Sequence, residues 1–194
     1  MPHSEPFRLR RARAGDAAQV VPLLVEAIDH LALQLAGASE HAAAWPMFEQ
    51  LFVTRGNRYS HQHVLLLEQA GDIAAVALAY PGAQEAALAA PVIKLLRQRE
   101  PQSRHEHERE SADDEFYLDA LAVAAAFRGQ GLAVQIMEAV YARAIDAGYR
   151  RIGLLVDLDK PGVQRLYERL GFAIDGERWL AGHRYQHMSH VLID

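Results

Sequence analysis

Cysteine is absent from the 194-residue chain. Without thiols the protein forms no disulfide, holds no metal through thiolate ligands and has no cysteine nucleophile, which excludes a cysteinyl-acyl intermediate. The absence also fits a reducing compartment, so we expect a cytoplasmic protein.

Long apolar runs and an excess of positive charge are also missing. No stretch approaches the roughly 20 apolar residues that a membrane-spanning helix needs. The N-terminal segment "MPHSEPFRLRRARAGD" lacks the apolar core of a secretory signal. The net charge of −5 and the pI near 6.0 disfavour binding to nucleic acid or anionic lipid. We therefore expect neither a membrane nor a nucleic acid as a partner.

Apolar residues, in contrast, make up 51% of the sequence, which is enough for the core of one domain of this length. We expect a single domain spanning 1–194, with an insertion at about 83–115. Periodicity and turn signals predict strands and helices in an alternating order. The expected strands are 7–12, 63–69, 73–80, 116–123, 151–158, 172–180 and 184–193, and the expected helices are 16–37, 39–52, 83–99, 132–147 and 161–170.

The order of these elements combines hairpins with one β-α-β crossover. Hairpins form antiparallel pairs and a crossover forms a parallel pair, so we expect an α/β (α+β) fold with a mixed, mostly antiparallel sheet and helices on both faces. The segment 99–115 is highly polar and without periodicity, which predicts a mobile loop. Within it, His105 and His107 stand among many acidic residues, and a solvated charge run explains them better than a metal site does.

The segment "AFRGQGLA", 126–133, joins a predicted strand to a predicted helix. A helix N-terminus has free backbone N–H groups and a positive dipole end, and glycine lets a ligand approach the backbone closely, so this junction suits an anion. The segment lacks the Gly-Lys-Ser/Thr ending of an ATP-binding loop. It also has Val134 where a dinucleotide-binding motif needs a third glycine. By itself, the segment is better explained by a plain strand-to-helix turn without a ligand.

The stretch "LAVAAAFRGQGLA" resembles the acetyl-CoA signature of the GNAT superfamily of N-acetyltransferases. That signature is Arg/Gln-x-x-Gly-x-Gly/Ala, which Arg128, Gly131 and Ala133 satisfy. Downstream, "VQRLYERLGF" resembles the family's A-x-x-L-Y-x-x-x-G-F segment, with Val163 in place of the alanine. The stretches "RLRRARAGDAAQV" and "YQHMSHVL" are similar to the family's first and last strands, so the resemblance covers nearly the whole chain.

The resemblance implies that acetyl-CoA is the co-substrate, that no metal takes part, and that the β-α-β unit is the acyl-CoA-binding core. The strand 116–123 would splay from the next parallel strand, and the gap would admit the thioester. In many members an asparagine that helps to fix the CoA arm lies seven residues before the tyrosine of the second motif. In this sequence that tyrosine is Tyr167, and Lys160 occupies the position of the asparagine. The implied cofactor-binding residues are Leu121, Ala122 and Val123 for the pantetheine arm, Arg128, Gly129, Gln130, Gly131, Leu132 and Ala133 for the pyrophosphate, and Lys160.

The implied chemistry is the attack of a neutral amine on a thioester carbonyl. An alkyl amine has a pKa of about 10.4, so it needs a general base. Asp119 is our first candidate for that base and Glu115 the second, although Asp119 also suits a structural pairing with an arginine. Tyr167 matches the family tyrosine that protonates the departing thiolate, and core packing is an equally good explanation of it.

Two other functions stay open at this point. The first is a non-catalytic acyl-CoA-binding module that binds a partner through 83–115, and the second is a nucleotide-binding α/β domain. For an enzyme, the acceptor would be a small-molecule or peptide amine, and the acidic insertion favours a cationic one. A homodimer is the default expectation among soluble oligomers.

Overall fold

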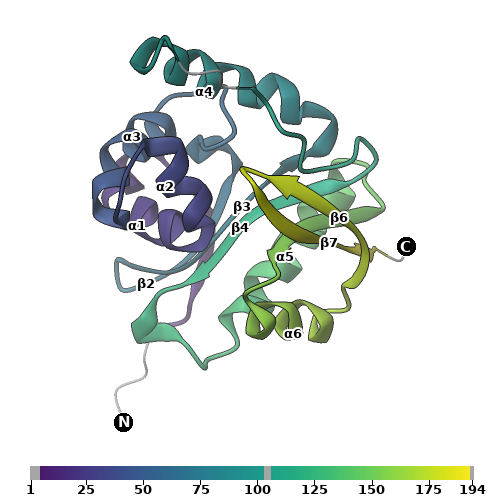
Figure 1. Ribbon diagram of the computed structural model, residues 1–194. Coiled ribbons are helices and arrows are strands. Elements are labelled where there is room, and N and C mark those ends of the chain that lie inside the picture. The colour runs from purple at the N-terminus through teal and green to yellow at the C-terminus, as the bar shows by residue number, and fades with distance from the viewer. Residues whose placement is uncertain (1–4, 103–105, 193–194) are drawn as a thin grey trace. The chain divides into compact units, whose positions relative to one another are not determined.

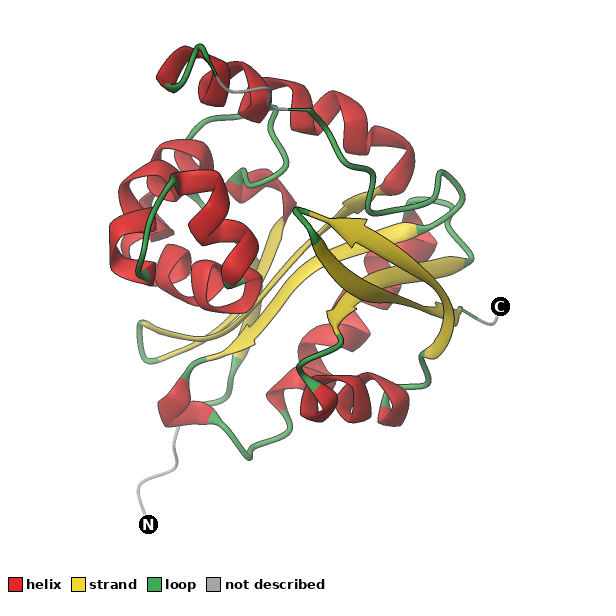
Figure 2. Ribbon diagram, viewed as in Figure 1, coloured by secondary structure: helices red, strands yellow, loops and turns green. Residues whose placement is uncertain are grey.

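The computed structural model describes residues 5–102 and 106–192. Its strands form one sheet in the order β1-β2-β3-β4-β5-β7-β6 (Figure 2). The pair β4–β5 is parallel, whereas β1–β2, β2–β3, β5–β7 and β6–β7 are antiparallel. The predicted mixed, mostly antiparallel α/β fold is therefore confirmed. The strands are β1 (Arg8–Arg11), β2 (Val64–Gln69), β3 (Asp72–Pro81), β4 (Phe116–Val123), β5 (Arg151–Asp157), β6 (Ala173–Leu180) and β7 (His183–Val191).

The α-helices of the described residues also lie close to the predicted positions, with one exception. The helix expected over 16–37 is two helices, because Asp29 adopts φ 56° and ends the first of them. The helix expected over 39–52 begins at His41, with Glu40 as its N-cap residue. The helices are α1 (Ala17–Ile28), α2 (His30–Ala36), α3 (His41–Val53), α4 (Glu85–Arg99), α5 (Leu132–Asp146) and α6 (Pro161–Arg169).

The chain packs into two compact units. The first comprises Met1–Leu78 with Ala120–Val140, and the second comprises Ala79–Asp119 with Tyr141–Asp194. Strands β3 and β4 and helix α5 each run from one unit into the other. Among the described helices, no single one is long and apolar enough to cross a membrane. Helices α1 and α2 together have the length and the composition of a membrane span, but a 110° bend separates them.

The first unit contains β1, the β2–β3 hairpin and the helices α1 to α3, which lie together in the purple-to-blue part of the chain (Figure 1). Helices α1 and α3 contact each other along their lengths, and α2 packs against both. The core of this unit includes Val20, Leu24, Phe48, Phe52 and Leu66, all of which are fully buried. Burying each such side chain stabilises the fold by about 1.5–3 kcal/mol.

The second unit contains the sheet β4-β5-β7-β6 together with α4 and α6. Its C-terminal hairpin, drawn in yellow-green to yellow in Figure 1, turns at Ala181 and Gly182. Both residues have positive φ values, 54° and 79°, as a two-residue hairpin turn of matching twist requires. Phe116, Ile152 and Met188 on adjacent strands are buried at 1% exposure or less and form part of its core.

The described part of the polar segment before β4 makes hydrogen bonds to α4, and its mobility stays a prediction. Glu85, in the first turn of α4, is only 1% exposed. Its carboxylate accepts hydrogen bonds from the backbone N–H groups of Glu110 and Ser111 at 2.9 and 2.8 Å. Burial alone would raise the pKa of Glu85, but hydrogen bonds from the side chains of His107 and Ser111, together with these two backbone bonds, lower it to about 2. A buried, ionised carboxylate on α4 therefore anchors residues 106–115, whereas His105 lies outside the described residues.

Candidate active site

The predicted signature loop begins α5 in the first unit. Gly129 and Gly131 have φ values of 78° and 77°, in the left-handed region that side chains rarely adopt. The carbonyl of Gly131 accepts hydrogen bonds from the N–H groups of Val134 and Gln135 at 3.1 and 3.2 Å. Gly131 thus starts the helix, and the glycines satisfy a backbone requirement that their spacing in the sequence predicted.

The backbone donors at this helix start point to an anion. Within the described residues, the N–H groups of Gly131, Leu132 and Ala133 have no hydrogen-bond acceptor. They lie at the N-terminus of a 15-residue helix, whose dipole also favours negative charge. Such a group of donors binds anions such as phosphate. This loop therefore has the chemistry that the pyrophosphate of CoA requires.

Arg128 is held beside the loop by two contacts within the same unit. Its Nη2 lies 3.0 Å from Oε1 of Glu26 on α1, and its Nε donates to the carbonyl of Val123 at 3.1 Å. Both charged side chains are more than half exposed, at 59% and 56%, so the ion pair stabilises the protein by about 1 kcal/mol at most. The second contact joins the loop to the end of β4.

The end of β4 becomes more accessible as it approaches the loop. Phe116 to Leu118 are buried, whereas Leu121, Ala122 and Val123 are half-buried. The N–H of Ala124 donates to the carbonyl of Ala74 on β3 at 2.9 Å, which holds this end of the strand in the first unit. The predicted pantetheine residues thus lie on a supported strand with partly accessible atoms.

In the second unit, Asp119 lies where the ladder between β4 and β5 ends. Among the described residues, the ladder pairs Phe116 with Ile152 and continues to Leu118 with Leu154, although both strands extend further. Asp119 is the next residue of β4, and its Oδ2 accepts a hydrogen bond from the Tyr80 hydroxyl at 2.7 Å. Sequence reasoning found Asp119 but missed Tyr80, for which the sequence has no local signal.

Glu115, the second candidate for the base, has a structural role instead. It is fully buried, and its carboxylate accepts hydrogen bonds from Ala112 N–H at 2.8 Å, His187 Nε2 at 3.0 Å and Arg151 Nη2 at 3.1 Å. Burial alone would raise the pKa of Glu115, but the bonds from His187 and Ala112 outweigh it and hold the pKa below its usual value. The carboxylate also occupies the space that a side chain at position 153 would need, so this position is glycine. Because Glu115 is 0% exposed and its oxygens are bound by three donors, a substrate amine cannot reach the carboxylate.

Tyr167 lies on α6 and is 7% exposed, with its ring edge-on to Phe172 at 5.5 Å between centroids. Burial, with a smaller contribution from Tyr141, raises the pKa of Tyr167 well above its usual value of 10. A tyrosine hydroxyl is protonated at neutral pH even without this shift, and the raised pKa makes the Tyr167 hydroxyl a weaker acid. Asp119 and Tyr167 belong to the same unit but contact different side chains, Tyr80 for Asp119 and Phe172 for Tyr167.

The Gly-Phe pair that ends the second motif has a packing explanation. Gly171 has φ 89°, and a Cβ there would come within 2.9 Å of the His190 ring. That ring stacks against Tyr141 and Phe172 at centroid distances of 5.2 and 5.6 Å. Only glycine allows this approach, and the resulting aromatic cluster surrounds Tyr167.

Lys160 links β5 to α6. Its carbonyl accepts hydrogen bonds from Val163 and Gln164 at 3.0 and 3.2 Å, and its own N–H donates to Asp157 at 2.9 Å. Pro161 follows as the first residue of the helix, a position that suits a residue without an N–H group. Lys160 is therefore the N-cap residue of α6, and binding of CoA by its side chain stays a prediction.

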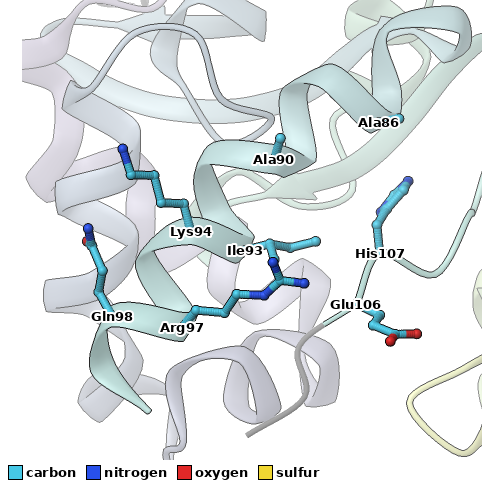
Figure 3. Close-up of a pocket in the computed structure, with 8 residues that line it drawn as sticks. All are labelled: Ala86, Ala90, Ile93, Lys94, Arg97, Gln98, Glu106 and His107. Atoms are coloured by element: carbon cyan, nitrogen blue, oxygen red, sulfur yellow. The ribbon is translucent and has the colours of Figure 1, made fainter. Parts of the chain in front are cut away.

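A pocket of about 540 Å³ lies beside α4 in the second unit. Figure 3 shows Ile93 and Arg97 on the helix and Glu106 and His107 on the facing segment. None of the candidate catalytic or cofactor residues lines it. The described residues also contain no group of three or more His, Asp or Glu side chains placed to hold a metal ion; His107 Nε2 instead lies 3.1 Å from the Glu85 carboxylate.

The comparisons with known proteins agree with this geometry. Residues 25–172 match the model of the Acetyltransferase (GNAT) family, and the chain belongs to this family. A search of the curated proteins finds no match.

Solved structures of acetyltransferases superpose on most of the chain. One crystal structure, described as an acetyltransferase, is 28% identical, with a TM-score of 0.74 over 96% of this chain and 100% of its own. An N-acetyltransferase from Staphylococcus aureus Mu50 is 24% identical, with a TM-score of 0.77 over 94% and 99%. AAC(6')-Ib in complex with ribostamycin and coenzyme A shares the fold, at 16% identity and a TM-score of 0.61 over 96% and 94%.

Proposed function

We propose that the protein is an N-acetyltransferase that transfers the acetyl group of acetyl-CoA to a primary amine by direct attack in a ternary complex. The observation that carries the proposal is the start of α5. There, two glycines with positive φ precede three backbone N–H groups that have no acceptor in the described chain. Membership of the acetyltransferase family supports acetyl-CoA as the source of the anion that these groups bind.

For the donor, we assign the pyrophosphate to the backbone of Arg128–Ala133 and the pantetheine arm to Leu121–Val123, with Lys160 as a further contact. The hydrogen bond from Arg128 to Val123 supports this assignment, because it joins the two groups of residues. Coenzyme A is bound in AAC(6')-Ib, which has the same fold.

For the chemistry, Asp119 accepts a proton from the acceptor ammonium, directly or through a water molecule, and the neutral amine attacks the thioester carbonyl. Asp119 precedes Leu121 on β4 by two residues, so it lies next to the strand segment assigned to the pantetheine arm. Tyr167 then donates its proton to the departing thiolate, whose conjugate acid has a pKa of about 8.5.

For the acceptor, we propose a small-molecule or peptide amine that carries positive charge. The described part of the acidic segment supports this choice, since Glu106, Glu108 and Asp113 add negative charge to the second unit and attract cations. The structure of AAC(6')-Ib contains an aminoglycoside, ribostamycin, so the same fold accommodates a cationic small molecule.

Two measurements test this function. Calorimetry with CoA, ATP and NAD should show binding of CoA alone, and binding of ATP or NAD without CoA would instead indicate a nucleotide-binding domain. Thiol release from acetyl-CoA in the presence of diamines, aminoglycosides and peptides should depend on the amine. Binding of CoA without release by any amine would support a non-catalytic acyl-CoA-binding module.

A further inference from the structure

Tyr80 is a polar side chain in a fully buried position. It lies near the end of β3, is 0% exposed, and donates a hydrogen bond to Asp119 Oδ2 at 2.7 Å. A buried hydroxyl needs a partner, and a bond to a carboxylate is stronger than one to a neutral acceptor. The bond therefore restrains both the hydroxyl and the carboxylate.

The Tyr80 ring is itself held in place. It packs with Leu88 and Tyr117 in a buried cluster, and the two tyrosine rings lie 5.9 Å apart at an angle of 55°. Tyr117 and Asp119 are two residues apart on β4 and so face the same side of the strand. The hydroxyl of Tyr117 donates to Glu110 Oε2 at 2.8 Å.

Glu110 belongs to the segment that Glu85 anchors to α4, through its backbone N–H at 2.9 Å from Glu85 Oε1. A continuous chain of contacts thus leads from α4 through Glu110, Tyr117 and Tyr80 to Asp119. Every member lies in the second unit. The titratable groups along the chain are the phenols of Tyr80 and Tyr117 and the carboxylates of Glu85, Glu110 and Asp119, and the His107 imidazole lies 3.1 Å from Glu85. Residues inserted between β3 and β4 thereby reach the candidate base.

We propose that Tyr80 is a positioning residue for Asp119, supported by Tyr117 and Glu110, and that this support is the function of segment 106–115. The inference rests on the proposed role of Asp119 as the general base. The phenol fixes the carboxylate in one orientation and, because a hydrogen bond to the charged form favours that form, keeps it ionised and able to accept a proton.

The test is Tyr80→Phe, which removes the hydroxyl and keeps the ring. We expect kcat to fall about tenfold, with the KM for acetyl-CoA unchanged. The acidic limb of the pH profile of kcat/KM should move to higher pH, because the ionised carboxylate loses a hydrogen bond. Tyr149→Phe is the matched control. It removes a tyrosine hydroxyl whose ring packs on Phe116, and it should leave kcat and the pH profile of kcat/KM unchanged.

A readout without turnover is the titration of the Asp119 side-chain carboxyl carbon, followed by NMR in the folded protein. Its midpoint should rise in Tyr80→Phe. If Tyr80→Phe does not fold, Tyr117→Phe replaces it. In that variant the midpoint of the Asp119 titration should rise by a smaller amount. An unchanged midpoint together with an unchanged pH profile would overturn the inference.

Asp119→Asn separates this inference from the proposed function. If Asp119→Asn is inactive while Tyr80→Phe has the wild-type profile, only the positioning role of Tyr80 is wrong. If Asp119→Asn retains full activity, Asp119 is not the base, and the inference fails with that assignment.

Discussion

At the scale of single residues, Gly131 is the position where the proposed donor site is most sensitive. Gly131→Asp places a side chain where φ is 77° and a negative charge at a helix N-terminus. We expect the affinity for CoA, measured by calorimetry, to fall about a hundredfold or more. Gly131→Ala is the control for backbone strain alone and should lose less. Wild-type affinity in folded Gly131→Asp would refute the assignment of this loop.

Tyr167 offers a second prediction. A tyrosine hydroxyl is protonated at neutral pH and so has a proton to donate to the thiolate, although burial raises the pKa of Tyr167 and makes it a weaker acid. Tyr167→Phe should lower kcat about a hundredfold and leave the affinity for CoA unchanged, because the ring still packs against Phe172. Steady-state kinetics and calorimetry measure the two effects. Normal turnover would leave Tyr167 with a packing role only.

Single residues also show which features of the structure could be predicted from the sequence and which could not. The start of α5 directly after the glycine segment and the start of α6 at Pro161 followed from local sequence patterns. Glu85 and Glu115 look like surface charge in the sequence, yet both are buried. Their burial depends on partners from distant segments, such as His187, 72 residues after Glu115, and a local pattern holds no information about such partners.

At the scale of elements, one ionic cluster joins the strands of the second unit. His187 on β7 is 1% exposed and lies between Glu115, just before β4, and Asp175 on β6. Arg151 on β5 contacts both carboxylates, at 3.1 and 3.5 Å. Burial alone would lower the pKa of His187, but its hydrogen bonds to Glu115 and Asp175 raise it. A charged imidazole therefore holds these strands together.

This cluster predicts a pH-dependent stability. The contribution of His187 is complete below its ordinary pKa of 6.5 and is lost as pH rises through the raised pKa. The contribution of Glu115 is complete above its ordinary pKa of 4.5 and is lost as pH falls through the lowered pKa. We expect His187→Gln to lower the free energy of unfolding by about 3 kcal/mol, most strongly between pH 4.5 and 6.5.

Urea unfolding across pH measures this difference, with His183→Gln, an exposed histidine in the same hairpin, as the control. A difference that stays constant from pH 4 to 9 would show that the imidazole contributes by packing and not by charge.

The break between α1 and α2 shows the limit of pattern reading for an element. The run "VEAIDHLALQLA" keeps helical periodicity through Asp29, so the sequence predicts one helix. In the structure Asp29 adopts φ 56° and its carboxylate lies 2.9 Å from His41 Nε2, at the start of α3. The break thus coincides with a tertiary contact of Asp29, whereas the end of α2 at Gly37, where φ is 62°, was predicted from the sequence.

At the scale of the whole molecule, the two motifs and the order of the elements were enough to predict the family and the mixed sheet. The donor could be predicted because most of its proposed contacts come from one short, continuous segment, 121–133. No sequence motif is assigned to the acceptor, so its identity could not be predicted. The support of the candidate base was also missed: Tyr80, Glu110 and Asp119 contact one another directly or through Tyr117, yet no sequence pattern links them.

The most direct test of the central claim is to incubate the protein with isotope-labelled acetyl-CoA and a panel of amines and to identify the products by mass spectrometry. We predict that at least one cationic amine gains a single labelled acetyl group on nitrogen, with one free thiol released per transfer. Gly131→Asp should abolish the transfer at the same donor concentration. Binding of CoA with no labelled product from any amine would contradict the account.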